Sequence, residues 1–301
     1  MEVLKTLNII RITVFVMTWF TGIILNSSIV AVYFRDWKNS RYFSVCDKIF
    51  LSKALLNIVQ QCLISINGIV IYVALYLLFA KKMYVLVFIC NFSLVYGNFW
   101  YSAWLSIYYF LKLVKHSHRF FLQLKKTLSS STVLILILTM LGMVFINLPS
   151  IWAIDQVFPQ NETIIQSGDN YQIKINDLFG VLNLVCGGCF PFMATFVCIG
   201  FSVASLLSHV WRRQKNVSLN TSSPQTQGLL RAVRTMSLQL TINGVLYMAV
   251  IFVYQTPFAS ETILDLIQWT IIVSFPSAQA IILILGNPKL CDRLFCQAFQ
   301  S

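Results

Sequence analysis

Seven apolar runs, each long enough to cross a lipid bilayer as a helix, constrain the fold of this chain more than any other feature. Residues 84–111 and 129–152 contain no Asp, Glu, Lys or Arg. A soluble domain could not keep such a surface dispersed, since 57% of the chain is hydrophobic and only 11% is charged. Because a helix satisfies its own backbone hydrogen bonds, the sequence predicts an all-α membrane protein, a seven-transmembrane-helix bundle. The runs lie at roughly residues 9–34, 48–71, 84–111, 129–152, 180–210, 234–256 and 263–286.

Basic residues between the runs predict the orientation of the bundle. If the N-terminus is extracellular and the C-terminus cytoplasmic, 17 of the 22 Lys and Arg residues lie on the cytoplasmic side, as the positive-inside rule expects. We predict one domain over residues 1–301, with residues 72–83 forming an extracellular turn. The 17 basic residues are Arg35, Lys38, Arg41, Lys48, Lys53, Lys112, Lys115, Arg119, Lys125, Lys126, Arg212, Arg213, Lys215, Arg231, Arg234, Lys289 and Arg293.

The third run combines an aromatic half with a basic end. Trp100 and Trp104 are four residues apart, so they share a helix face, and Lys112 opens the basic segment that follows. Trp100 lies too far from that segment for a residue of the membrane-interface belt. We expect a ligand against the aromatic half and a cytoplasmic partner against the basic end. Core or lipid packing is the alternative reading of the two tryptophans.

Polar residues inside the other runs predict structural or switching roles. Asn26 is expected to form a packing hydrogen bond, because an unpaired amide in lipid is costly. Lys53 is expected either to extend toward the membrane interface or to pair with a polar group such as Asn26 or Asn287. Pro191 is expected to bend the fifth helix, where neighbouring groups can satisfy the freed carbonyl.

The segments outside the bilayer suggest modification sites and one charged contact. Asn161 opens an Asn-Glu-Thr glycosylation triplet in the longest extracellular loop, 153–179. Cys291 and Cys296 in the short tail are candidate palmitoylation sites. Asp265, near the extracellular mouth, could attract a cationic ligand or be a solvated carboxylate at the loop edge.

Several other functions find little support in the residues. The only histidines, His116, His118 and His209, lie at the cytoplasmic edge without the partners that catalysis or a metal site would need, so we expect neither an enzyme nor a cofactor. The basic residues occupy short loops rather than a patch on a soluble fold, so the net charge of +12 does not indicate nucleic-acid binding. A small membrane transporter is a remote alternative, because the chain shows no internal repeat.

Four motifs, in order along the chain, together resemble one receptor family. They are Trp100 followed by Tyr108-Tyr109-Phe110-Leu111-Lys112 and His116-Ser117-His118; Pro191-Phe192 followed by Ser205-Leu206 and His209; Arg231-Ala232-Val233-Arg234; and Pro276-Ser277 with Leu285-Gly286-Asn287-Pro288-Lys289-Leu290. This pattern is similar to that of the bitter taste receptors of the type 2 taste receptor family. Gln279 and Lys53 depart from it, since the family often has His at the first position and usually Arg at the second. Vomeronasal type 1 receptors, which bind pheromone-like molecules, are the alternative.

The resemblance implies a G protein-coupled receptor in the plasma membrane that binds small, largely hydrophobic bitter compounds and activates a gustducin-type heterotrimeric G protein. It implies ligand contacts at Trp100, Tyr101, Trp104 and Trp269, with Tyr247 as a weaker candidate. We expect the G protein to face Lys112, His209, Arg231 and Arg234, and membrane lipid to surround the bundle. The sequence leaves both a monomer and a homo-oligomer open.

Overall fold

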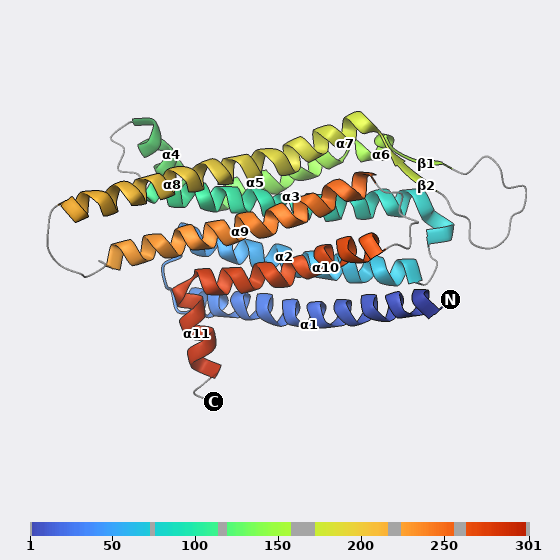
Figure 1. Ribbon diagram of the computed structural model, residues 1–301, viewed down its shortest axis with the longest axis horizontal. Coiled ribbons are helices and arrows are strands. Elements are labelled where there is room, and N and C mark those ends of the chain that lie inside the picture. The colour runs from blue at the N-terminus through green and yellow to red at the C-terminus, as the bar shows by residue number, and fades with distance from the viewer. Residues whose placement is uncertain are drawn as a thin grey trace, which may run out of the picture.

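The computed structural model shows a bundle of long helices lying side by side (Figure 1). It describes residues 2–72, 76–113, 119–157, 172–215, 224–255 and 263–298. The N-terminus and a β-hairpin lie at one end, here called the N-terminal end, and α11 crosses the opposite end. In chain order the elements are α1 (Glu2–Lys38), α2 (Val45–Tyr72), α3 (Tyr76–Leu113), α4 (Arg119–Ser130), α5 (Thr132–Asn147), α6 (Ser150–Ala153), β1 (Ile154–Val157), β2 (Gln172–Ile175), α7 (Asp177–Leu184), the π-helical segment η1 (Val185–Cys189), α8 (Phe190–Lys215), α9 (Pro224–Gln255), α10 (Ile263–Gly286) and α11 (Pro288–Ala298).

Seven helical segments in the described part of the chain are long and apolar enough to span a membrane, which confirms the predicted seven-helix bundle. They are Thr6–Lys38, Val45–Ile66, Val85–Lys112, Thr132–Ala153, Asp177–Ser205, Leu230–Phe252 and Leu266–Gly286. The third is the most enclosed, with 61% of its apolar window buried against 17% for the first. The helix with the aromatic half and the basic end therefore lies at the centre of the bundle.

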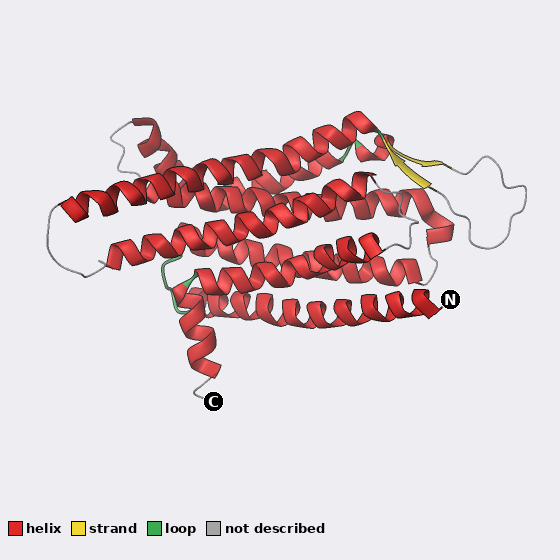
Figure 2. Ribbon diagram, viewed as in Figure 1, coloured by secondary structure: helices red, strands yellow, loops and turns green. Residues whose placement is uncertain are grey.

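The predicted extracellular turn at residues 72–83 is wrong for most of its length, because α3 begins at Tyr76. Lys81 and Lys82 interrupt the apolar pattern, but lysine is a good helix former. No Gly or Pro between residues 73 and 83 supplies a turn, so the helix continues through both lysines. In the predicted loop 153–179, β1 and β2 pair antiparallel with Ile154 opposite Ile175, and they form the hairpin drawn in yellow in Figure 2.

A chain of buried polar side chains joins α1, α2, α3 and α10 inside the bundle. The Asn26 amide donates to the carbonyl oxygens of Gly22 and Pro276, at 2.8 and 3.2 Å. Asn57 donates to Asn26 Oδ1 at 3.0 Å, and Asn98 donates to Asn57 Oδ1 at 3.3 Å. The predicted packing hydrogen bond of Asn26 is therefore present, and it connects three helices.

Lys53 has different partners from those that we predicted. Its side chain is fully buried, so it does not extend to the membrane interface. Lys53 Nζ donates to Ser102 Oγ at 2.6 Å and to the Asn98 carbonyl oxygen at 3.2 Å, both on α3. Neither Asn26 nor Asn287 bonds it in the described structure, because its side chain points from α2 toward α3 rather than toward α1 or α10.

An ionic cluster holds α11 against the end of α1. The Asp36 carboxylate, with 1% of its side chain exposed, binds Lys289 Nζ at 2.7 Å and also the Arg293 guanidinium. Asn287 lies between α10 and α11, where its Oδ1 accepts from the Lys289 backbone N–H at 3.0 Å and its amide donates to Tyr33 Oη at 3.0 Å. Asn287 therefore caps α11 while Asp36 fixes its first turns.

Candidate functional site

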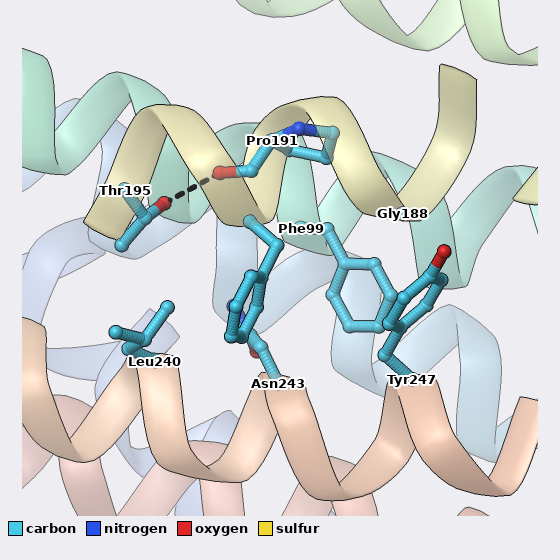
Figure 3. A pocket seen from close by; sticks show the side chains of 8 residues that line it. Phe99, Gly188, Pro191, Thr195, Leu240, Asn243 and Tyr247 are labelled. Atoms are coloured by element: carbon cyan, nitrogen blue, oxygen red, sulfur yellow. Dashed lines mark hydrogen bonds between the residues drawn. The ribbon is translucent and has the colours of Figure 1, made fainter. Parts of the chain in front are cut away.

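A small cavity lies near the middle of the bundle, between α3, α9 and the segment formed by η1 and α8 (Figure 3). Its empty volume, which includes open solvent, is about 210 Å³, and a water-sized sphere can be centred in only about 10 Å³ of it. Drug-sized ligand sites usually measure roughly 300–1,000 Å³, so a ligand of that size would have to displace a side chain from the wall. The cavity is lined by Phe99, Gly188, Pro191, Phe192, Thr195, Leu240, Asn243 and Tyr247.

The wall contributed by η1 and α8 has an irregular backbone for a clear reason. Pro191 has no backbone N–H, and in a regular helix its ring would clash with the carbonyl of Gly187. The chain forms the π-helical turn Val185–Cys189 immediately before this proline. Such turns widen a helix locally and occur often at functional sites. The structure places a π-helical segment that ends two residues before Pro191, where we predicted a bend.

Two aromatic side chains bond to carbonyl oxygens of this part of the chain. Trp100 Nε1 on α3 donates to the Cys186 carbonyl oxygen at 3.2 Å. Tyr247 Oη on α9 donates to the Leu184 carbonyl oxygen at 3.1 Å. Trp100 and Tyr247, which we predicted as ligand contacts, therefore converge on one short segment from two different helices.

The same segment lets aromatic rings approach its backbone closely because it contains two glycines. A Cβ at Gly187 would meet the ring of Tyr96, with Cε2 at 2.6 Å. A Cβ at Gly188 would overlap the ring of Tyr247, whose Cζ lies 3.0 Å from that position. Each glycine thus leaves room for a flat ring against the backbone. In Figure 3 the Tyr247 side chain reaches from α9 toward Gly188.

Phe99 contacts aromatic rings of two other helices at this site. Its ring is nearly perpendicular to Tyr247, with centroids 6.4 Å apart, and to Phe275 on α10, at 6.3 Å. Deeper in the cavity, Asn243 Oδ1 accepts a hydrogen bond from Gln279 Nε2 at 2.8 Å. The cavity therefore combines apolar side chains with several polar groups, the two kinds of wall that small-molecule sites use.

The other predicted ligand contacts lie elsewhere. Tyr101 Oη donates to the Leu136 carbonyl oxygen at 2.9 Å, and Trp104 Nε1 donates to Thr139 Oγ1 at 3.1 Å, so both side chains face α5. Trp269 packs against Phe15 of α1, with ring centroids 6.4 Å apart. None of the three is among the described side chains that line the cavity, and neither is Trp100, which contacts the adjoining segment at Cys186.

The residues that we predicted to face a G protein lie at the opposite end from the N-terminus. Lys112, near the end of α3, and Arg231 and Arg234, on α9, are exposed. The side chains of His209, Asp265 and Cys296, as well as Asn161 itself, lie outside the described residues. Cys291 is half-buried on α11.

Some lining residues were absent from the sequence-based prediction. Phe99 and Leu240 give no signal in the sequence that separates them from ordinary apolar packing residues. Asn243 and Tyr247 are four residues apart on one helix, and this spacing could have identified them as a pair facing inward. Gly188 could have been found from Gly187-Gly188-Cys189-Phe190-Pro191, since paired glycines before a helix proline indicate close backbone approach.

Comparison with known proteins supports a single family over nearly the whole chain. The family described as Taste receptor protein (TAS2R) matches residues 3–300. Taste receptor type 2 member 9 of Pan troglodytes is 28% identical over 282 residues, and member 140 of Rattus norvegicus is 27% identical over 276. Member 7 of Papio hamadryas is 29% identical over 280 residues. Each of these alignments covers 89% of this chain and 86% of the relative.

The family match decides between the alternatives that the sequence left open. It covers all seven membrane-spanning segments and all four motifs that carried the resemblance. It therefore favours a taste receptor over a vomeronasal receptor or a transporter, and a receptor over an enzyme. The chain belongs to the TAS2R family, the bitter taste receptors among the G protein-coupled receptors, and is a multi-pass protein of the plasma membrane.

Proposed function

We propose that this receptor binds small, largely hydrophobic bitter compounds in the cavity between α3, α8 and α9 and then activates a gustducin-type G protein. The observation that carries the proposal is the convergence of Trp100 and Tyr247 on the π-helical segment next to that cavity. Flat apolar rings with a few hydrogen-bonding atoms suit hydrophobic and aromatic ligands. Asp265 near the mouth remains a candidate contact for a cationic group.

The orientation follows from the basic residues. We place the N-terminal end outside the cell and the end with α11 in the cytoplasm, because 17 of the 22 Lys and Arg residues then lie on the cytoplasmic side. A ligand from outside the cell enters at the end of the bundle that carries the β-hairpin and reaches the cavity from that extracellular end. In this orientation Asn161 is available for glycosylation, and Cys291 and Cys296 are available for palmitoylation.

Activation requires that the ligand prefer one of two bundle conformations. The cavity bridges α8 and α9, and Tyr247 connects the two sides of it through its bond to Leu184. A ligand that enlarges the cavity changes the packing between these helices. Their cytoplasmic ends then part and admit the G protein against Lys112, His209, Arg231 and Arg234.

The outside of the bundle is suited to lipid. Large apolar side chains are exposed along α5, including Leu134, Leu138 and Phe145, which are 56%, 56% and 68% exposed. We propose that lipid tails cover them, and a homo-oligomer would bury part of the same surface.

A calcium-reporter assay in cells that express the receptor with a gustducin-type G protein tests the proposal. We expect a panel of bitter compounds to contain agonists, and Trp100→Ala to lower their potency at least about tenfold, since truncating an aromatic hot-spot contact costs about 2 kcal/mol or more of binding free energy. Trp104→Ala is the matched control, because its indole bonds to Thr139 on the α5 side. Unchanged potency of every agonist on Trp100→Ala would refute the placement of the ligand against Trp100 and the adjoining π-helical segment.

A further inference from the structure

We propose that the π-helical segment is a subsite for flat aromatic ligands that donate a hydrogen bond, such as phenols, and that Tyr247 occupies this subsite until a ligand replaces it. The inference rests on the proposed function, because it names the ligand chemistry that the cavity would select. It depends on three features of the wall: a carbonyl oxygen, a glycine and an aromatic edge.

The carbonyl oxygen of Leu184 is the acceptor. A backbone carbonyl has two lone pairs, so it can accept a side-chain or ligand donor in addition to any helix bond. In the structure this extra donor is the phenol of Tyr247, with Oη 3.1 Å from the Leu184 oxygen. A ligand that removes Tyr247 without supplying a donor leaves this oxygen with a lost hydrogen bond in an apolar setting, which is unfavourable.

Gly188 and Phe99 give the subsite its flat shape. The ring of Tyr247 lies so close to Gly188 that even one added carbon at this position would overlap it. On another side, Phe99 meets the same ring at 85°, in an edge-to-face arrangement. The side chain of Tyr247 is itself a phenol, so its size, its flat ring and the position of its hydroxyl indicate which ligand groups the subsite would bind.

Tyr247 is also the side chain of the wall best placed to leave. The cavity must grow to hold a drug-sized ligand, because a water-sized sphere can be centred in only about 10 Å³ of it. Phe99 is 3% exposed and contacts rings of α3, α9 and α10, so its displacement would disturb the core. Tyr247 is half-buried, and one hydroxyl bond joins it to the opposite wall.

A second aromatic donor on the same segment supports this chemistry independently. The indole of Trp100 donates to the carbonyl oxygen of Cys186, at 3.2 Å, two residues along the chain from Leu184. Residues 184–186, at the start of the π-helical segment, thus already accept hydrogen bonds from two aromatic donors on two helices. The acceptors are therefore backbone carbonyl oxygens, those of Leu184 and Cys186, and do not depend on any one side chain of the segment.

The test uses pairs of planar phenols and their O-methyl ethers as probes of the full-length receptor, in the calcium-reporter assay with surface expression measured in parallel. For each pair the readouts are the two half-maximal concentrations and their ratio, ether over phenol. The variants are Tyr247→Phe, which removes the competing hydroxyl and keeps the ring, and Tyr101→Phe. Tyr101 is the matched control because its hydroxyl bonds to the Leu136 carbonyl oxygen on the far side of α3.

We expect the phenols to be more potent than their ethers on the unmodified receptor. On Tyr247→Phe the phenols and the ethers should both become about two- to tenfold more potent, because neither then has to break the hydroxyl bond of Tyr247, which is worth one hydrogen bond. The ratio should therefore stay above one on both variants, and potency should rise on Tyr247→Phe alone. A ratio of one on the unmodified receptor, unchanged potencies on Tyr247→Phe, or an equal rise on Tyr101→Phe overturns the subsite while the receptor function stands. A receptor that reaches the surface and responds to no member of any pair overturns the subsite and counts against the proposed function as well.

Discussion

Removing the charge of Asp36 should release α11 from the bundle. The carboxylate is almost fully buried and binds Lys289 Nζ at 2.7 Å and the Arg293 guanidinium, both on α11. Asp36→Asn keeps the shape of the side chain but loses both ion pairs. Breaking a fully buried pair costs about 3–5 kcal/mol. Here the two cations are 31% and 26% exposed, so water relieves part of their loss.

We therefore expect α11 to lose about 1.5–3 kcal/mol of local stability, a discount of roughly half from the buried limit. Because each 1.4 kcal/mol is a factor of ten, the backbone amides of α11 should exchange with deuterium about 10- to 100-fold faster. The measurement is hydrogen–deuterium exchange of the purified receptor in lipid nanodiscs, followed on peptides that cover residues 288–298.

Arg41→Gln provides the matched control at the same carboxylate. Its guanidinium lies 3.4 Å from Asp36, but its side chain is 55% exposed and it lies outside α11. Exposed ion pairs contribute about 0–1 kcal/mol, so exchange in α11 should rise less than about fivefold. Exchange in α11 that is the same for Asp36→Asn as for the unmodified receptor would refute the role of this cluster.

Two further predictions concern stability and are measured as thermal unfolding of the purified receptor. Lys53→Met should leave the melting temperature unchanged or raise it, because an apolar side chain of similar length replaces a buried amino group. Ser102→Ala should lower the melting temperature, with a loss of about 1–3 kcal/mol of stability, because the buried Lys53 then has one fewer acceptor. A lower melting temperature for Lys53→Met and an unchanged one for Ser102→Ala would contradict the reasoning. Gly188→Ala should destabilise the receptor by about 1–3 kcal/mol, because the added methyl group overlaps Tyr247. Gly142→Ala should be neutral or stabilising, by up to about 1 kcal/mol, since nothing lies within 4 Å of the added carbon; equal effects of the two alanines would disprove the close contact.

The fold could be predicted from the sequence because the bilayer imposes a local rule. A segment that crosses the membrane must be apolar and helical over its whole length, and both properties can be read residue by residue. The prediction for residues 263–286 agrees with α10 at both ends. The error at residues 72–83 arose because two lysines end an apolar run without ending a helix.

The site could be predicted only in part, because a helix face does not specify which neighbour it meets. Trp100 and Trp104 share a face by spacing, yet the first bonds to Cys186 and the second to Thr139 on α5. The buried α3 contacts different helices along and around its length, so residues one turn apart point into different environments. Lys53 shows the same limit, since its partners on α3 are more than 40 residues away in the chain.

The sequence by itself determined the number of membrane-spanning helices and the motifs that identify the family, and its basic residues supply the orientation that we propose. These features depend on composition and on order along the chain. Only the tertiary structure decided that Tyr247 lies on Gly188, that Trp100 bonds to the π-helical segment and that Asp36 binds α11. The physical reason is that hydrogen bonds and ion pairs between helices act over about 3 Å, and the tilt and rotation that bring side chains so close come from the packing of the whole bundle.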